Sequence, residues 1–79
     1  LLNAYKLDRN NFIIVEGLAS QANKTRLDLY NLLGKKVLSI NLSNHTNSQT
    51  ISTEGLSSGI YVIKLQSSNS LLTKKLIVK

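Results

Sequence analysis

The chain has 79 residues and a net charge of +6 at pH 7, and it contains neither cysteine nor proline. A chain of this length forms one small domain with little room for a substrate cleft, and the absence of cysteine excludes disulfide bonds and thiolate metal sites. The positive charge indicates an acidic partner or surface, but the basic residues are scattered and the aromatic residues few, which argues against nucleic-acid binding.

The first eleven residues, LLNAYKLDRNN, are expected to be a linker or the start of the domain, and residues 12–79 to be the domain itself. This stretch lacks the basic start, apolar middle and small-residue cleavage site of a signal peptide. The chain also lacks an initiator methionine and any run of 18 apolar residues. We therefore expect it to be a fragment or a processed product of a longer protein.

Short stretches with the composition and alternation of β-strands follow, separated by turn residues at intervals of roughly 8–12 residues. They are Phe12–Val15, Arg26–Tyr30, Lys36–Leu42, Gln49–Thr53, Ile60–Gln66 and Leu71–Lys79. Asn31–Lys35 has the composition of a hairpin loop whose glycine, Gly34, can take a positive φ. The pattern predicts an all-β fold, a small antiparallel Ig-like β-sandwich of six to seven strands.

The sequence shows no arrangement of catalytic residues, so we expect no enzyme, no cofactor and no small-molecule substrate. His45 is the one histidine and lies in a polar stretch, whereas a zinc site needs three or four ligands. The four acidic residues are far apart, and a glycosidase pair is disfavoured in so small a domain; they are Asp8, Glu16, Asp28 and Glu54. The segment GLSSG, residues 55–59, lacks the spacing of a nucleophile elbow.

Three motifs in order are LYNLLGKKV (residues 29–37), GLSSGIYVIKL (55–65) and TKKLIVK (73–79). Together they resemble the type A C-terminal sorting domain of type IX secretion cargo in the Bacteroidetes. The family's aromatic followed by G-+-x-V is matched by Tyr30 and residues 34–37, and its L-x-x-G-x-Y-x-v-+ segment by residues 56–64. The resemblance covers residues 12–79, although the chain lacks the family's proline-containing box and has Ser57 and Ser58 where many members have a proline.

The resemblance implies a domain that directs a larger cargo protein across the outer membrane. The cargo would pass through the periplasm and then be secreted or held at the cell surface. The implied partners are outer-membrane components of the secretion machinery, namely a shuttle barrel and a sortase-like peptidase that commonly cleaves the domain off.

Residues of the first two motifs are predicted to be architectural, namely Gly34, Gly55, Leu56, Gly59 and Tyr61. The turn at Gly55–Gly59 would set the register of the following strand, and a slip of one residue would turn its apolar side chains to solvent. Gly59 is expected to take a backbone conformation that a Cβ would oppose. Tyr61 is expected to bury its ring while its hydroxyl reaches a backbone partner.

The end of the chain is the candidate for the recognised surface: Lys74, Lys75, Leu76, Ile77, Val78 and Lys79. If this strand lies at a sheet edge, its backbone groups can add to a partner's strand, and its lysines can steer it to an acidic site. The alternative interpretation is that Leu76 and Val78 are core residues and that the lysines only protect the edge from aggregation.

Two other functions remain open. An Ig-like adhesion or carbohydrate-binding module would need a platform of exposed aromatic residues or a calcium site of clustered acids, and the few aromatics, at least two of them expected to be buried, and the dispersed acids argue against it. A spacer domain of a surface protein would be followed by more chain. Pairing of two copies through an exposed edge strand also remains open.

Overall fold

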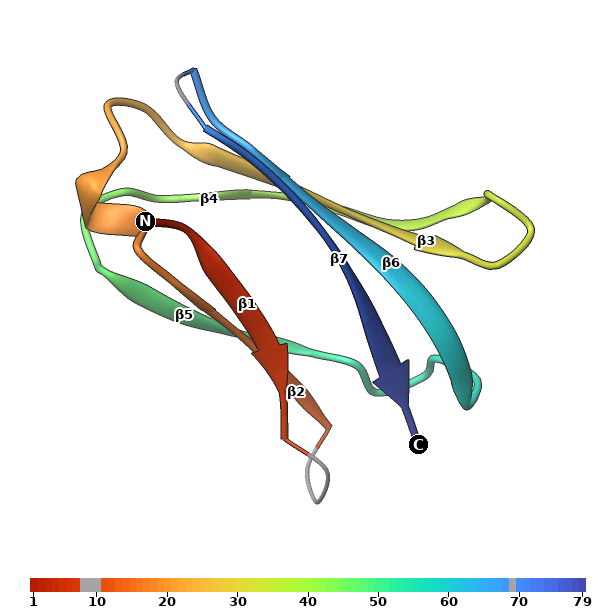
Figure 1. Cartoon of the computed structure of the whole chain (residues 1–79). Coiled ribbons are helices and arrows are strands. Elements are labelled where there is room, and N and C mark those ends of the chain that lie inside the picture. Colours follow the sequence, from red (N-terminus) through yellow and green to blue (C-terminus); the bar gives the residue numbers. More distant parts are fainter. Residues whose placement is uncertain (8–10, 69) are drawn as a thin grey trace.

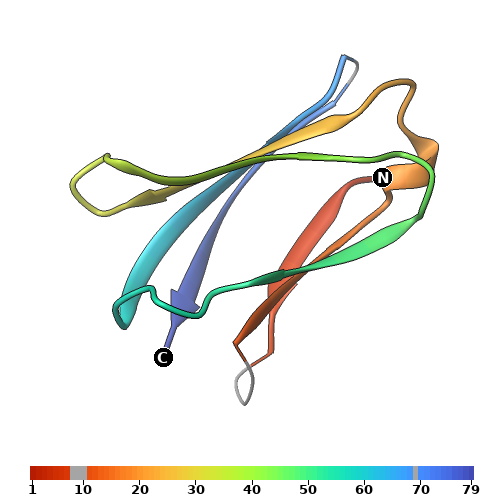
Figure 2. The same cartoon turned by 180° about the vertical axis from the view of Figure 1, so that it is seen from behind.

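The computed structural model describes residues 1–7, 11–68 and 70–79, and these residues form seven strands in two antiparallel sheets. The strands are β1 (Asn3–Lys6), β2 (Phe12–Glu16), β3 (Thr25–Asn31), β4 (Lys36–Leu42), β5 (Ser48–Ser52), β6 (Gly59–Gln66) and β7 (Leu71–Val78). One sheet has the order β1-β2-β5 and the other β4-β3-β6-β7, and the two face each other (Figures 1 and 2). The predicted all-β sandwich is confirmed.

Each of the six stretches with strand patterning forms a strand, and the seventh strand, β1, lies in the segment before Phe12. β1 pairs with β2, with Ala4 opposite Val15. The connection between β2 and β3 contains a short 3-10 turn, η1 (Leu18–Ser20). The expected turn at Asn10-Asn11 lies partly outside the described residues.

The core consists of the inward side chains of both sheets, as the period-two alternation predicts. Leu27 and Leu29 of β3 lie opposite Leu65 and Ile63 of β6, and all four are fully buried. The facing sheet contributes further buried residues, namely Ala4, Ile13, Val15 and Ile51. Burying a Val, Leu or Ile side chain stabilises the fold by about 1.5–3 kcal/mol, so the register of β3 and β6 is strongly specified.

Gly17 permits the close approach of the N-terminal segment to the end of β2. Its φ is 89°, and a Cβ at this position would collide with the main-chain carbonyl of Leu1. Only glycine avoids both the left-handed strain and this collision. The close approach helps to hold β1 against β2.

Two edge strands from different sheets, β1 and β7, lie side by side in both views (Figures 1 and 2). The side-chain Nζ of Lys74 in β7 donates a hydrogen bond to the main-chain oxygen of Ala4 in β1, at 2.7 Å. The C-terminal end of β7 is therefore placed at an open edge of the sandwich, beside the first strand of the chain.

Candidate recognition site

The end of the chain lies at a sheet edge, since β7 pairs with β6 and with no second strand among the described residues. Its side chains alternate across the strand. Leu76 and Val78 are buried in the core, whereas Ile77 and Lys75 lie on the outward face and are exposed. Lys79 follows β7 and is exposed as well. The two interpretations of this segment thus describe its two faces, a core face and a free outer face.

Lys74 differs from the neighbouring lysines because it lies on the core side of β7, opposite the buried Ile63. Its side chain reaches across the gap between the sheets to the carbonyl of Ala4. A charged side chain that points inward on an edge strand hinders the addition of a further strand. Lys74 is exposed like Lys75, but its hydrogen bond to Ala4 links β1 to β7, and we call this link the latch.

A shallow groove of about 260 Å³, called here the edge groove, runs between β1 and β7. The residues that line it are Tyr5, Lys6, Lys74, Lys75, Leu76 and Ile77. Three of them are lysines and none is acidic, so the groove favours an acidic or carbonyl-rich occupant. Four of the six residues predicted to be recognised thus come together in one groove, and Tyr5 and Lys6, on the opposite wall, were not predicted.

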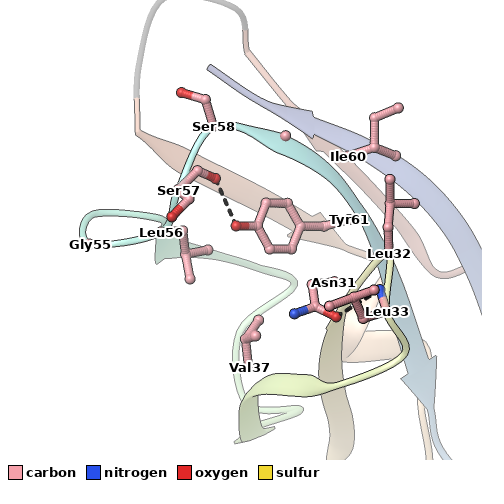
Figure 3. Close-up of a pocket in the computed structure, with 11 residues that line it drawn as sticks. Asn31, Leu32, Leu33, Val37, Gly55, Leu56, Ser57, Ser58, Ile60 and Tyr61 are labelled. Carbon is pink, nitrogen blue, oxygen red and sulfur yellow. Dashed lines mark hydrogen bonds between the residues drawn. The ribbon is translucent and has the colours of Figure 1, made fainter.

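The first two sequence motifs, residues 29–37 and 55–65, meet at one end of the sandwich, where they frame a second cavity of about 460 Å³ (Figure 3). We call this end the loop pole. The residues that line its cavity are Asn31, Leu32, Leu33, Val37 and Gly55–Tyr61. None of these is a carboxylate, a histidine or a cation, so the cavity offers packing surface and backbone groups rather than acid–base chemistry.

Tyr61 anchors the loop pole. Its side chain is buried, and its hydroxyl donates a hydrogen bond of 2.7 Å to the main-chain oxygen of Ser57, as Figure 3 shows. The bond closes the loop of residues 55–59 onto the strand that follows it. The predicted burial of the ring and the predicted backbone partner of the hydroxyl are both present.

Gly34 and Gly55 lie in turns, as expected, whereas Gly59 is the first residue of β6. Gly34 and Gly55 have φ of 83° and 90°, in the left-handed region that disfavours a Cβ. The φ of Gly59 is 158°, also a positive value that residues with a Cβ rarely adopt, although a Cβ there would meet no atom within 4 Å. All three glycines therefore have a backbone conformation that a residue with a Cβ rarely adopts, as was expected of Gly59.

Asp28 is a buried carboxylate whose role the sequence did not reveal. It lies on the outward face of β3, and its side chain accepts a hydrogen bond of 2.7 Å from the Ser39 hydroxyl. Arg26 Nε lies 3.1 Å and Lys36 Nζ 3.7 Å from its oxygens. Burial raises the pKa of Asp28, but these hydrogen bonds and positive charges outweigh it, and the pKa lies below its ordinary value of 3.8.

The alternating segment RLDLY could have pointed to this cluster, because Arg26 and Asp28 share one face of a strand. The contribution of Ser39 and Lys36 depends on the pairing of β3 with β4 and is not visible in the sequence. Since Asp28 faces cations and a hydroxyl rather than a second carboxylate, it stabilises the sheet and forms no glycosidase pair.

Other candidate residues lie apart from these two surfaces. His45 is exposed between β4 and β5, as expected, and Asp8 lies outside the described residues. Tyr61 is the one buried aromatic residue within the described ranges; Tyr5 and Tyr30 are half-buried and Phe12 is exposed, so the expectation of at least two buried aromatics was wrong. Within residues 1–7, 11–68 and 70–79, no group of three or more His, Cys, Asp or Glu is placed to hold a metal ion.

A search for membrane-crossing helices among the described residues finds none of sufficient length and apolar character. The fold is that of a small β-sandwich module with an edge groove and a loop pole. The family of secretion system C-terminal sorting domains matches residues 9–79, and the chain therefore belongs to this family. A comparison with curated proteins found no match.

Membership of the family means that the chain is a sorting signal of type IX secretion, as the resemblance of its three motifs implied. The signal directs export across the outer membrane to the cell surface or the medium, and it does so by interaction with the secretion machinery. The family is one of sorting domains and not of enzymes.

Proposed function

We propose that the secretion machinery recognises this domain through the outer side of β7, by adding a strand to its open edge. The observation that carries the proposal is that the side chains of the segment Lys74–Lys79 are divided between a buried and an exposed face of the strand. Leu76 and Val78 hold the strand in the core, which leaves Ile77 and Lys75 to face outward from a strand that already has the extended conformation a partner strand needs.

The charge of the edge sets the character of the partner. Lys75 and Lys79 are exposed and the edge groove contains no acid, so an acidic site on the outer-membrane shuttle barrel or on the sortase would be attracted to it. Such attraction acts mainly on the association rate and weakens with salt. Strand addition also requires Lys74 to release Ala4, which makes recognition dependent on the β1 edge.

In the same proposal a sortase-like peptidase then separates the domain from its cargo, on the N-terminal side of the sandwich. The cargo passes through the periplasm before export, and it is afterwards released or attached to the surface. An alternative use of the same edge is the pairing of two copies of the domain through β7, since an unpaired edge strand is a template for either partner.

The test is export of a fluorescent reporter, carrying a periplasmic signal, that is fused to residues 1–79 in a type IX-competent host. Truncation after Leu72 is a poor test because it removes the buried Leu76 and Val78 and thereby weakens the fold. The sharper variants are Lys75→Glu and Ile77→Ser, which alter only exposed side chains of the proposed surface.

Lys24→Glu is the matched control, because it reverses an exposed lysine outside β7. We expect the wild type and Lys24→Glu to be exported and the two β7 variants to remain in the periplasm while folded. Normal export of Lys75→Glu and Ile77→Ser would show that the outer side of β7 is not recognised. Size-exclusion chromatography of the same proteins separates dimer formation from recognition.

A further inference from the structure

The β3–β4 hairpin carries two exposed leucines at its tip. Leu32 is 69% and Leu33 93% exposed, and the tip lies at one extreme of the molecule in both views (Figures 1 and 2). Exposing two adjacent leucines on a projecting turn is unfavourable in water. Such a tip is suited to burial in another phase or another molecule.

The apolar surface continues from the tip onto the outward face of the four-stranded sheet. Leu32 and Ile60 both line the cavity of the loop pole, as Figure 3 shows. Ile60 of β6 is paired with Ile77 of β7, and these two side chains are 37% and 57% exposed. The leucine tip and the isoleucine pair thus form one outward apolar surface.

Asn31 accepts the hydrogen bonds of the amides at the tip. Its Oδ1 accepts hydrogen bonds of 3.0 Å from the amides of Leu33 and Lys35, and its main-chain oxygen accepts one of 3.0 Å from the amide of Gly34. The amide of Asn31 in turn donates to the oxygen of Lys35. A turn whose amides are bonded internally can enter an apolar medium without the cost of several kcal/mol for each unpaired group.

Most charges around this surface are positive, and the exception is the exposed Glu54 directly before the loop of the pole. Lys35 and Lys36 follow the leucines after one glycine, Lys75 lies on the same face of β7 as Ile77, and β4, β6 and β7 contain no acidic residue. Asp28, on the outward face of β3, is already neutralised by Arg26 and Lys36.

Apolar side chains next to lysines are the pattern of a surface that binds anionic lipid. We propose that the hairpin tip Leu32–Lys35, with the adjoining pair Ile60 and Ile77, inserts into a membrane surface that carries anionic headgroups. The internally bonded amides favour lipid over a protein partner, because a protein surface would offer donors and acceptors whereas hydrocarbon offers none. Membrane contact of this kind would share Ile77 with the proposed strand addition at the edge of β7, but it would depend on the hairpin tip, which strand addition does not use.

The absence of tryptophan from the chain allows a direct test with a single introduced fluorophore. Leu33→Trp places the fluorophore at the tip, and Leu71→Trp places it at a leucine that is 63% exposed at the other end of the sheet. With vesicles of phosphatidylglycerol and phosphatidylcholine, we expect a blue shift of the emission for Leu33→Trp and none for Leu71→Trp. Equal shifts at both positions, or none at either, would overturn the proposal.

Vesicle co-sedimentation measures the contribution of each group. The double variant Leu32→Ser/Leu33→Ser is expected to lower the partition coefficient about tenfold or more, and Lys35→Ser about fivefold, whereas Leu71→Ser leaves it unchanged. Glu54→Gln is expected to strengthen binding, because Glu54 is an exposed carboxylate directly before the loop of the pole. Binding that is insensitive to the leucines contradicts insertion.

The vesicle assays use the purified chain and do not depend on export, so they can fail while the sorting assay succeeds. If the leucine variants bind vesicles like the wild type but block export of the reporter, the tip contacts a protein of the machinery and the lipid proposal is wrong. Thermal unfolding of each variant, followed by circular dichroism, confirms that the compared proteins are folded.

Discussion

The loop pole and the edge of β7 differ in how their exposed groups are used. At the loop pole, the Tyr61 hydroxyl donates a hydrogen bond to Ser57, and the Asn31 side chain accepts hydrogen bonds from amides of the hairpin tip. These polar groups therefore already have partners within the chain. At the edge, β7 has β6 as its strand partner on one side, and Lys75 and Ile77 face outward. Residues of a recognisable motif are therefore not automatically residues of a binding site, because most of the motif at the loop pole serves to build the loop.

The largest expected effect on stability is that of Tyr61→Ala. Removing a buried aromatic side chain costs about 3–5 kcal/mol, whereas Tyr61→Phe, which removes only the hydrogen bond to Ser57, costs about 1 kcal/mol. Urea unfolding monitored by circular dichroism measures both. Ile77→Ser is the control and is expected to change stability by less than about 0.5 kcal/mol. If Ile77→Ser destabilised the fold as much as Tyr61→Ala, the contrast between the two regions would be false.

Gly55→Ala is expected to have the next largest effect on stability, and it tests the loop pole. The φ of 90° at this position costs a residue with a Cβ about 1–2 kcal/mol, although the site is spacious. Ser58→Ala in the same loop changes an exposed side chain and is expected to be neutral. Urea midpoints of the two variants measure the difference. An unchanged midpoint for Gly55→Ala would mean that the loop can relax, and that the glycine does not fix it.

The lowered pKa of Asp28, which lies outside both regions, predicts that the stability of the fold depends on pH. Its pKa is lower in the folded chain than in the unfolded chain, so its contribution to stability is complete above the unfolded pKa of about 4 and is lost as the pH falls through the folded pKa. Stability measured by urea unfolding should therefore decrease below about pH 4. Asp28→Asn should be less stable at pH 7 and should flatten this dependence. A wild-type slope retained in Asp28→Asn would assign the acid sensitivity to other carboxylates.

The smallest expected effect is that of Lys74→Met, which removes the hydrogen bond to Ala4 and keeps most of the apolar stem. We expect a loss of stability below about 1 kcal/mol but faster amide exchange in β1, measured by hydrogen exchange and mass spectrometry. Lys75→Met, on the opposite face of β7, is the control and should leave β1 unchanged. Protection of β1 that is equal in both variants would show that Lys74 is not a latch.

Six strands were predictable because their side chains alternate with period two and glycine or serine clusters separate them. The buried set of β3 and β6 follows directly from that alternation. β1 was not predictable as a strand because Asn3–Lys6 is short and its patterning is weak. The place of β1 in the sheet depends on Gly17, which has no Cβ and so leaves room for Leu1. These two residues are far apart in the chain, and no local pattern of the sequence connects them.

The sequence by itself determined the all-β class, the turn glycines, the burial of Tyr61 and the resemblance to the sorting family, because each depends on local patterning or on a motif. Only the tertiary structure decided that β7 is an edge strand beside β1, that Lys74 points inward while Lys75 points outward, and that the first two motifs meet at the loop pole. The physical reason is that strand order follows from pairing between residues distant in the chain, such as Ala4 with Val15 and Leu29 with Ile63. Alternation assigns a side chain to a face of its strand, but the neighbouring strands decide whether that face meets the core, a groove or solvent.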